Sequence, residues 1–179
     1  LIGYPAAYIL ADRKLNRSSL TAVLFILPMW INALMRTLAT AEIFNSIGIG
    51  LGKGTLLFGL TYDYLPFMIY PIYTILSKMD RSYIEAAQDL GASPAKVFLK
   101  VTLPLSMPGV MSGVMMVFMP TVSTFAISEI LTNNTIQLFG SIIQEQFNNL
   151  MWNQGAALSL AMLIIIGLST LLQKNKDDN

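Results

Sequence analysis

The sequence contains neither cysteine nor histidine. The lack of cysteine excludes disulfides and thiolate chemistry, and the lack of both residue types removes the usual ligands of zinc and other soft metals. Without histidine the chain also lacks the side chain most often used for acid–base catalysis near neutral pH. The sequence therefore predicts no metal centre and offers no nucleophile with an evident base.

Charged residues are also scarce. They make up 12% of the 179 residues, and 11 basic against 10 acidic side chains leave a net charge of +1. The basic residues are scattered, so no basic patch indicates a nucleic-acid partner. Hydrophobic residues make up 54% of the chain and the mean hydropathy is +0.60, which is too apolar for an ordinary soluble domain of this size. The composition predicts a lipid bilayer as the environment.

The long apolar stretches predict an all-α integral membrane protein, because a helix needs about 20 apolar residues to cross about 30 Å of hydrocarbon. The stretch Leu1–Ala11 is too short for this, so we expect it to be the tail of a partial helix in which the chain begins. Ser18 and Ser19 are candidate caps for the next helix. Four complete spans are expected, at about residues 20–39, 55–76, 105–127 and 154–172.

Asp63 is the most unusual residue of these spans, since a carboxylate in an apolar span costs roughly 2.5 to 3.5 kcal/mol. It lies between Tyr62 and Tyr64, and carboxylates with aromatic rings suit a flexible polycation. The alternatives are that Asp63 pairs with Arg36 or lies near the surface. For Trp30 the alternative is packing or anchoring at the membrane interface. The candidate residues of a substrate pathway are Trp30, Tyr62, Asp63, Tyr64 and Glu129.

Residues 40–54 are expected to form a glycine-rich connector around Lys53. A phosphate-binding loop of the Walker type needs glycine six residues before the lysine and serine or threonine directly after it. Those places hold Ile47 and Gly54. The sequence therefore does not predict a nucleotide site in this chain.

Two further segments have spacings that predict helix contacts. Gly109 and Gly113 are four residues apart, a spacing that lets two helix backbones approach closely. Between residues 135 and 152, apolar side chains recur at helical intervals in a polar segment, which predicts a helix in or near the membrane interface.

The polar stretch from Ser82 to Pro104 predicts two short helices joined by a turn. Ser82 and Glu85 have the spacing of a capping box, and Gly91 suits the left-handed position that follows a helix. Ser93 followed by proline predicts the start of a second helix. Each predicted helix has one apolar face, so the pair is expected to be a docking element.

Basic residues indicate how the spans are oriented, because lysine and arginine are retained on the cytoplasmic side. Nine of the eleven lie in alternate loops, which places the segment 82–104 and the C-terminus in the cytoplasm. These nine are Arg13, Lys14, Arg17, Lys78, Arg81, Lys96, Lys100, Lys174 and Lys176.

The same polar stretch resembles the EAA loop of ABC-transporter permeases, with valine at position 101 where that pattern usually has isoleucine. The residues that carry this resemblance are Glu85, Ala86, Ala87, Gly91, Leu103 and Pro104. Further matching segments are Leu65–Met68, Pro71–Tyr73, Asp89–Ser93 and Leu103–Gly109. Through them nearly the whole chain resembles the spermidine/putrescine permease family of the PotB type.

The resemblance implies a MetI-like ABC importer transmembrane domain, with residues 1–179 as a single permease domain and coupling helices at about residues 80–103. It implies an ABC ATPase dimer, a second homologous permease and an extracytoplasmic substrate-binding protein as partners. ATP and Mg would be bound by the ATPase, with no cofactor in this chain. The six motif residues would couple the permease to the ATPase, although Glu85 is also explained by the capping box.

Three classes of function fit a membrane protein of this kind. A transporter subunit explains most of the features, with import of polyamines as the activity that the resemblance implies. The alternatives are a membrane-embedded enzyme, which would lack catalytic groups, and a channel or scaffold, which would not need the EAA spacing. A related permease for a different small solute is the nearest alternative.

Overall fold

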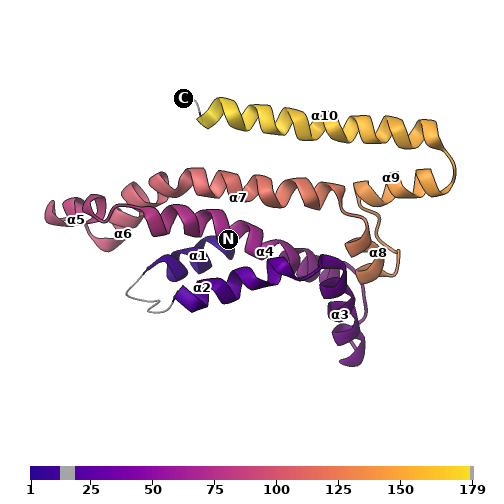
Figure 1. Ribbon diagram of the computed structural model, residues 1–179, viewed down its shortest axis with the longest axis horizontal. Coiled ribbons are helices and arrows are strands. Elements are labelled where there is room, and N and C mark those ends of the chain that lie inside the picture. The colour runs from indigo at the N-terminus through magenta and orange to yellow at the C-terminus, as the bar shows by residue number, and fades with distance from the viewer. Residues whose placement is uncertain (13–18, 178–179) are drawn as a thin grey trace. The chain divides into compact units, whose positions relative to one another are not determined.

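The computed structural model describes residues 1–12 and 19–177, with side chains except those of Ser19 and residues 172–177. Every regular element in these ranges is a helix (Figure 1), so the predicted all-α class is confirmed. The expected caps Ser18 and Ser19 and the basic run 13–17 lie outside the described side chains. The elements are α1 (Gly3–Ala11), α2 (Ser19–Ile26), η1 (Leu27–Trp30), α3 (Ala33–Ser46), α4 (Lys53–Lys78), α5 (Ser82–Asp89), α6 (Pro94–Val97), η2 (Phe98–Thr102), α7 (Leu103–Ser123), α8 (Ala126–Thr132), α9 (Phe139–Asn148) and α10 (Trp152–Asp177).

The helices form two compact units. Unit 1 comprises Leu1–Pro28 and Leu65–Met116, and unit 2 comprises Met29–Tyr64 and Val117–Asn179. The core of unit 1 joins α1 to α4, with Ala7 and Leu10 packed against Ile69 and Ile72. A second link in this unit is a hydrogen bond of 2.7 Å between the hydroxyls of Tyr4 on α1 and Ser106 on α7.

In unit 1 the two glycines of α7 lie against the backbone of α4. A Cβ added at Gly109 would lie 3.0 Å from the carbonyl oxygen of Pro71, and one added at Gly113 would lie 3.1 Å from that of Met68. Even a methyl group at either position would therefore press on the α4 backbone, and a larger side chain would push the two helices apart. The predicted close approach through this glycine pair is confirmed.

The core of unit 2 consists of Ala41 on α3, Leu56 on α4, and Ile127 and Leu131 on α8. The helix predicted near the interface is present as α9, which turns back into α10 (Figure 1). At this turn Leu150 has a φ of 60°.

The predicted connector at residues 40–54 is wrong in its first half, which is helical. Helix α3 continues to Ser46 because Thr40 and Ala41 are buried on it, so its inner face contributes to the core. Gly48 follows the end of this helix in a left-handed conformation, with a φ of 75°. The N–H of Ile49 then donates to the carbonyl of Phe44 at 2.9 Å, which satisfies one of the last carbonyls of the helix.

The predicted span at residues 20–39 is broken after Trp30 rather than only kinked at Pro28. Asn32 has extended backbone angles, and its side-chain oxygen accepts from the N–H groups of Leu34 and Met35 at 2.9 and 3.4 Å. This is the geometry of an N-cap, which starts a new helix. The predicted span at 105–127 is interrupted in the same way, since α7 ends at Ser123 and α8 begins at Ala126.

Two helices of the described ranges are long and apolar enough to cross a membrane. One is the continuous helix Pro94–Ser123, and the other is Trp152–Leu171 within α10. The broken pair Leu20–Trp30 and Ala33–Ser46 adds a third if it forms one span. Helix α4 has 26 residues, which gives it a length of about 39 Å at the usual rise per residue. Polar residues at its centre make it less apolar than these two helices. Each predicted span thus overlaps a helix or a helix pair.

The packing in unit 1 predicts that Gly109→Val destabilises the protein by about 1 to 3 kcal/mol, the usual range for overpacking. Gly167→Val is the matched control, since a Cβ at Gly167 would have no atom within 4 Å. Thermal unfolding of the purified protein in detergent, followed by circular dichroism, measures the difference. Equal melting temperatures for the two variants would contradict the close approach.

Candidate functional site

The polar segment after α4 begins with a cap supplied by Asp80. Its Oδ1 accepts the backbone N–H of Ser82 at 2.9 Å, and the hydrogen bonds from Ser82 hold the pKa of Asp80 below its ordinary value. The predicted capping box of Ser82 and Glu85 is therefore wrong. The N–H of Glu85, which that box would use, donates instead to the carbonyl of Arg81 at 2.9 Å.

Helix α5 ends at the glycine that the sequence predicts. Gly91 has a φ of 77°, a left-handed conformation. The N–H of Gly91 donates to the carbonyl of Gln88 at 2.8 Å, and that of Ala92 donates to the carbonyl of Ala87 at 3.1 Å. These two bonds form a Schellman motif, so the predicted turn is confirmed.

The second helix starts as predicted, with Ser93 in an extended conformation and Pro94 at the first helical position, although the Ser93 side chain makes no cap bond. Helix α6 runs into η2, a π-helical turn in which the N–H of Leu103 donates to the carbonyl of Phe98. Pro104 explains the turn, because proline has no N–H and its ring clashes with the carbonyl four residues earlier. The motif residues Leu103 and Pro104 thus set the register between η2 and α7.

Aromatic contacts fasten this segment to α1. The ring of Phe98 lies edge-on to the rings of Tyr4 and Tyr8, with centroids 5.9 and 5.6 Å apart. Val97 is buried beside it. The second short helix therefore has an anchored side, as its apolar face predicts.

Other side chains of the segment are exposed. Glu85 and Ala86 face solvent and Ala87 is half-buried. Three large apolar side chains are also exposed there, namely Tyr83, Leu90 and Leu99. Exposed apolar groups beside a polar rim mark interaction surfaces. We call Ser82–Thr102 the docking segment.

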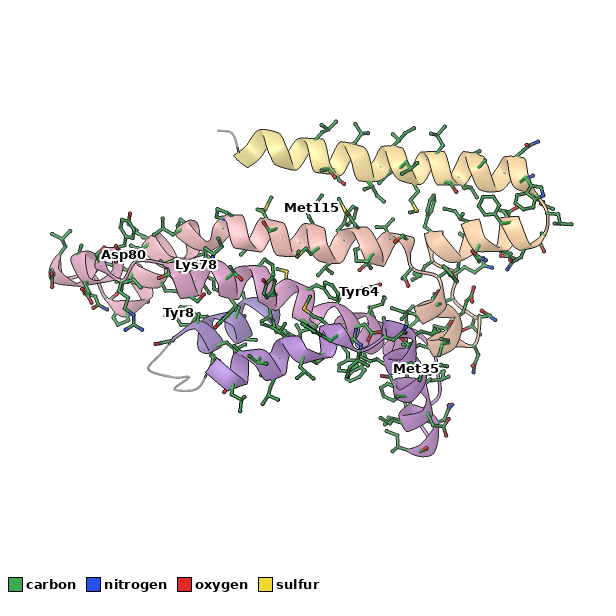
Figure 2. All side chains as sticks on the ribbon, viewed as in Figure 1. Tyr8, Met35, Tyr64, Lys78, Asp80 and Met115 are labelled. Atoms are coloured by element: carbon green, nitrogen blue, oxygen red, sulfur yellow. The ribbon has the colours of Figure 1, made fainter. Side chains whose placement is uncertain are left out.

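A cavity of about 540 Å³ lies beside the docking segment within unit 1. Its charged lining consists of Asp12 at the end of α1, Asp80 and Arg81 before α5, and Glu85 on α5. Tyr8 and Asp80 are labelled in Figure 2. Sequence reasoning missed Asp80, although an aspartate two residues before Ser82 is a recognisable capping signal.

A buried ion pair in unit 2 joins α3 to α4. Nη2 of Arg36 lies 3.2 Å from Oδ1 of Asp63, and the two side chains are 5% and 1% exposed. The same nitrogen donates to the backbone carbonyl of Asp63 at 3.1 Å, and the hydroxyl of Thr37 donates to Oδ2 at 2.9 Å. Of the alternatives for Asp63, the structure shows pairing with Arg36.

The arginine of this pair is incompletely bonded. Its Nε and Nη1 are buried and have no hydrogen-bond partner in the part of the chain that the structure describes. Its guanidinium carbon lies 5.5 Å from the centre of the Tyr62 ring, within the range of a cation–π contact. The aromatic ring predicted to meet a cargo cation therefore meets Arg36 in this structure.

The other candidate pathway residues lie on several elements. The hydroxyl of Tyr64 donates to the carbonyl of Pro120 at 3.4 Å (Tyr64 is labelled in Figure 2). Trp30 is exposed at the end of η1, and Glu129 is half-buried on α8. Among the described residues, no ion pair or hydrogen bond links Glu129 to Asp63.

The chain matches one family over residues 3–177, which is the family of binding-protein-dependent transport system inner membrane components. The chain belongs to this family. The predicted family of membrane transport proteins is thereby confirmed.

Relatives of this permease family share the matched region. The chain is 34% identical to the spermidine/putrescine transport system permease protein PotB of Escherichia coli, over 96% of this chain and 69% of that protein. It is 34% identical to PotB of Salmonella typhimurium, over 96% of this chain and 66% of that protein. A PotB homolog of Mycoplasma genitalium is 29% identical over 83% of this chain and 57% of its own length. The chain thus spans about two thirds of the enterobacterial relatives.

The ion pair predicts an asymmetric response to mutation. Arg36→Met should destabilise the protein by about 3 to 5 kcal/mol, because it leaves the Asp63 carboxylate buried without a counter-ion. The double variant Arg36→Met with Asp63→Leu removes both charges and should recover most of that loss. Thermal unfolding in lipid nanodiscs compares the variants, and a single variant as stable as the double one would show that Arg36→Met does not leave a buried, unpaired carboxylate.

Proposed function

We propose that the chain is the membrane-spanning permease subunit of an ATP-driven ABC importer for polyamines. The proposal rests on the family and on the similarity to spermidine/putrescine permeases. The structural observation that carries it is the docking segment, which is anchored to α1 through Phe98 and exposes Glu85 and Ala86. An exposed, rigid helix–turn–helix is what a membrane subunit needs in order to receive motion from a partner.

The proposed assembly contains an ABC ATPase dimer, a second homologous permease and an extracytoplasmic substrate-binding protein. ATP and Mg are bound by the ATPase, and this chain holds no cofactor and hydrolyses nothing. The docking segment and the C-terminus lie on the cytoplasmic side, which the distribution of lysine and arginine supports. Residues 1–179 act as a single permease domain whose coupling helices fall at about residues 80–103.

Each motif residue has a distinct role in coupling. Ala86 and Ala87 allow close approach of the ATPase because they are small, and Glu85 offers a charge to a basic residue of that partner. Gly91 supplies the turn between the two short helices. Leu103 and Pro104 fix the π turn that carries motion from the segment into α7.

The cargo pathway is proposed to include Tyr62, Asp63, Tyr64 and Glu129, with Trp30 near its end. A protonated amine bound at Asp63 would have to replace Arg36, which already occupies the carboxylate. This occupancy favours a second candidate function, in which a related permease carries a different small solute. Uptake of labelled spermidine and putrescine by the assembled transporter distinguishes the two candidate functions. Uptake of either compound supports the polyamine importer, and uptake of neither supports a different solute.

We predict that Gly91→Val abolishes ATP-dependent uptake, since a β-branched residue pays roughly 1 kcal/mol or more in the left-handed conformation. Gly91→Asn is the matched control, because asparagine tolerates that conformation and should retain most of the activity. Uptake into proteoliposomes and retention of the ATPase during purification are the two measurements. Normal values of both for Gly91→Val would contradict a coupling role for this turn.

We predict that Glu85→Gln and Glu85→Ala both reduce coupled uptake, because Asp80 rather than Glu85 caps α5. Circular dichroism should show that neither variant loses helix content. Asp89→Gln is a matched control, as Asp89 is exposed on the same helix outside the EAA motif. If Glu85→Gln transports like the parent while Glu85→Ala fails, hydrogen bonding rather than charge is the role of Glu85.

A further inference from the structure

The buried face of α3 is polar. Its buried residues are Arg36, Thr37, Thr40 and Ala41, and of these only Ala41 belongs to the apolar core of unit 2 in the part of the chain that the structure describes. The hydroxyl of Thr37 donates to Asp63, and that of Thr40 donates to the carbonyl of Arg36 on α3 itself at 2.8 Å. Most helical stability in proteins comes from the packing of an apolar face. Apolar burial therefore contributes little to the attachment of α3, and its polar contacts with α4 contribute correspondingly more.

The segments at both ends of α3 are loosely packed. Before the helix, Trp30 and Ile31 are 88% and 49% exposed. After it, a Cβ added at Gly48, Gly50 or Gly52 would have no atom within 4 Å. Packing thus does not explain these glycines, whereas the backbone freedom of glycine allows the connector to change conformation. Since hinges in proteins consist of a few such residues, α3 is able to move as a rigid helix between two hinge segments.

Helix α3 buries Asp63, whose side chain is 1% exposed. Arg36 of α3 pairs with this carboxylate and lies 5.5 Å from the centre of the Tyr62 ring. A cationic ligand at Asp63 would make the same two kinds of contact. However, Nε and Nη1 of Arg36 are buried without a hydrogen-bond partner among the described residues, so the loss of their hydration is not compensated. The observed position of α3 is therefore less favourable than the ion pair alone indicates, and movement of α3 would return both nitrogens to water.

We propose that α3 is a movable gate over Asp63 and that Arg36 is the residue that keeps the gate closed. In the closed position the guanidinium occupies the carboxylate that a cationic cargo would use. In the open position α3 carries Arg36 away into water and leaves Asp63 accessible to a cation. The proposal rests on the proposed function, since it says how an ATP-driven change of conformation gives the cargo access to this carboxylate.

The first measurement does not depend on transport. Because the chain has no cysteine, Thr40→Cys places a single thiol of this chain on the buried face of α3, at a position that is 8% exposed. The rate at which a water-soluble thiol reagent modifies the purified protein reports how often the gate opens. Asp63→Asn keeps an oxygen for the hydroxyl of Thr37 but removes the counter-ion of Arg36, so it should raise this rate by about ten-fold.

A matched thiol distinguishes opening of the gate from general unfolding. Ser106 on α7 is 0% exposed and belongs to unit 1, so the modification rate of Ser106→Cys should be the same with and without Asp63→Asn. Equal rates at Thr40→Cys with and without Asp63→Asn overturn the proposal. A parallel rise at Thr40→Cys and Ser106→Cys also overturns it, because the whole protein rather than α3 is then loosened.

The second measurement fixes the gate in the assembled transporter. The rings of Phe44 on α3 and Phe58 on α4 have centroids 5.3 Å apart, so a short bifunctional thiol reagent can bridge Phe44→Cys and Phe58→Cys. The bridge should abolish ATP-dependent uptake of labelled spermidine into proteoliposomes, and reductive cleavage of the bridge should restore it. The matched control is Leu57→Cys with Thr61→Cys, two exposed positions on α4 alone, where the same bridge should leave uptake unchanged.

The outcomes separate the gate from the cargo. Uptake that survives the bridge between α3 and α4 overturns the gate, whatever the modification rates are. If the unbridged transporter takes up neither spermidine nor putrescine, the polyamine cargo of the proposed function fails. The gate is then decided by the Thr40→Cys rates alone, which need neither cargo nor ATP.

Discussion

The rest of the structure depends on one constraint, which is that polar groups in an apolar helix bundle must find partners within the protein. Hydroxyl groups meet it through bonds to helix carbonyls or to each other, as Ser128 and Ser141 do at 2.7 Å. Asp63 meets it through Arg36 and Thr37. Proline lacks a backbone donor, and before Pro104 the backbone forms a π turn in which the N–H of Leu103 donates to the carbonyl of Phe98. Glycine allows α7 to approach α4 closely enough for the bundle to close in unit 1.

The docking segment is where this constraint is relaxed. Its backbone ends are satisfied locally, by Asp80 at the start of α5 and by the Schellman motif at Gly91. The side chains on its outer face are therefore left free for another surface. Its inner face is tied to α1 through Phe98 and continues into α7. A force applied to the outer face thus has a continuous helical path from Pro94 to Ser123.

The sequence predicts the features that depend on neighbours along the chain. Gly91 needs only its own conformational freedom, and Ser93 with Pro94 needs only the geometry of a helix start. The pair Gly109 and Gly113 predicts a close contact but not its partner, which the structure identifies as α4. The ion pair of Asp63 was one of several alternatives, because a single sequence contains no distances between helices. The predicted capping box was wrong because the N–H of Ser82 donates to the side chain of Asp80. The helix break at Asn32 was not predicted, because Pro28 is the stronger helix-breaking signal in the sequence.

The two ion pairs differ in the free energy needed to open them. Opening the Arg36–Asp63 pair leaves a guanidinium that is 5% exposed, and that already has two unbonded nitrogens, without its counter-ion, which costs about 3 to 5 kcal/mol unless the helices move. At the cavity, Arg81 is 53% exposed and Asp12 is 29% exposed. A guanidinium released there returns to water, where an exposed ion pair contributes only about 0 to 1 kcal/mol. The Arg81–Asp12 pair therefore opens without a rearrangement of the helices, whereas opening the Arg36–Asp63 pair requires a conformational change that separates α3 from α4.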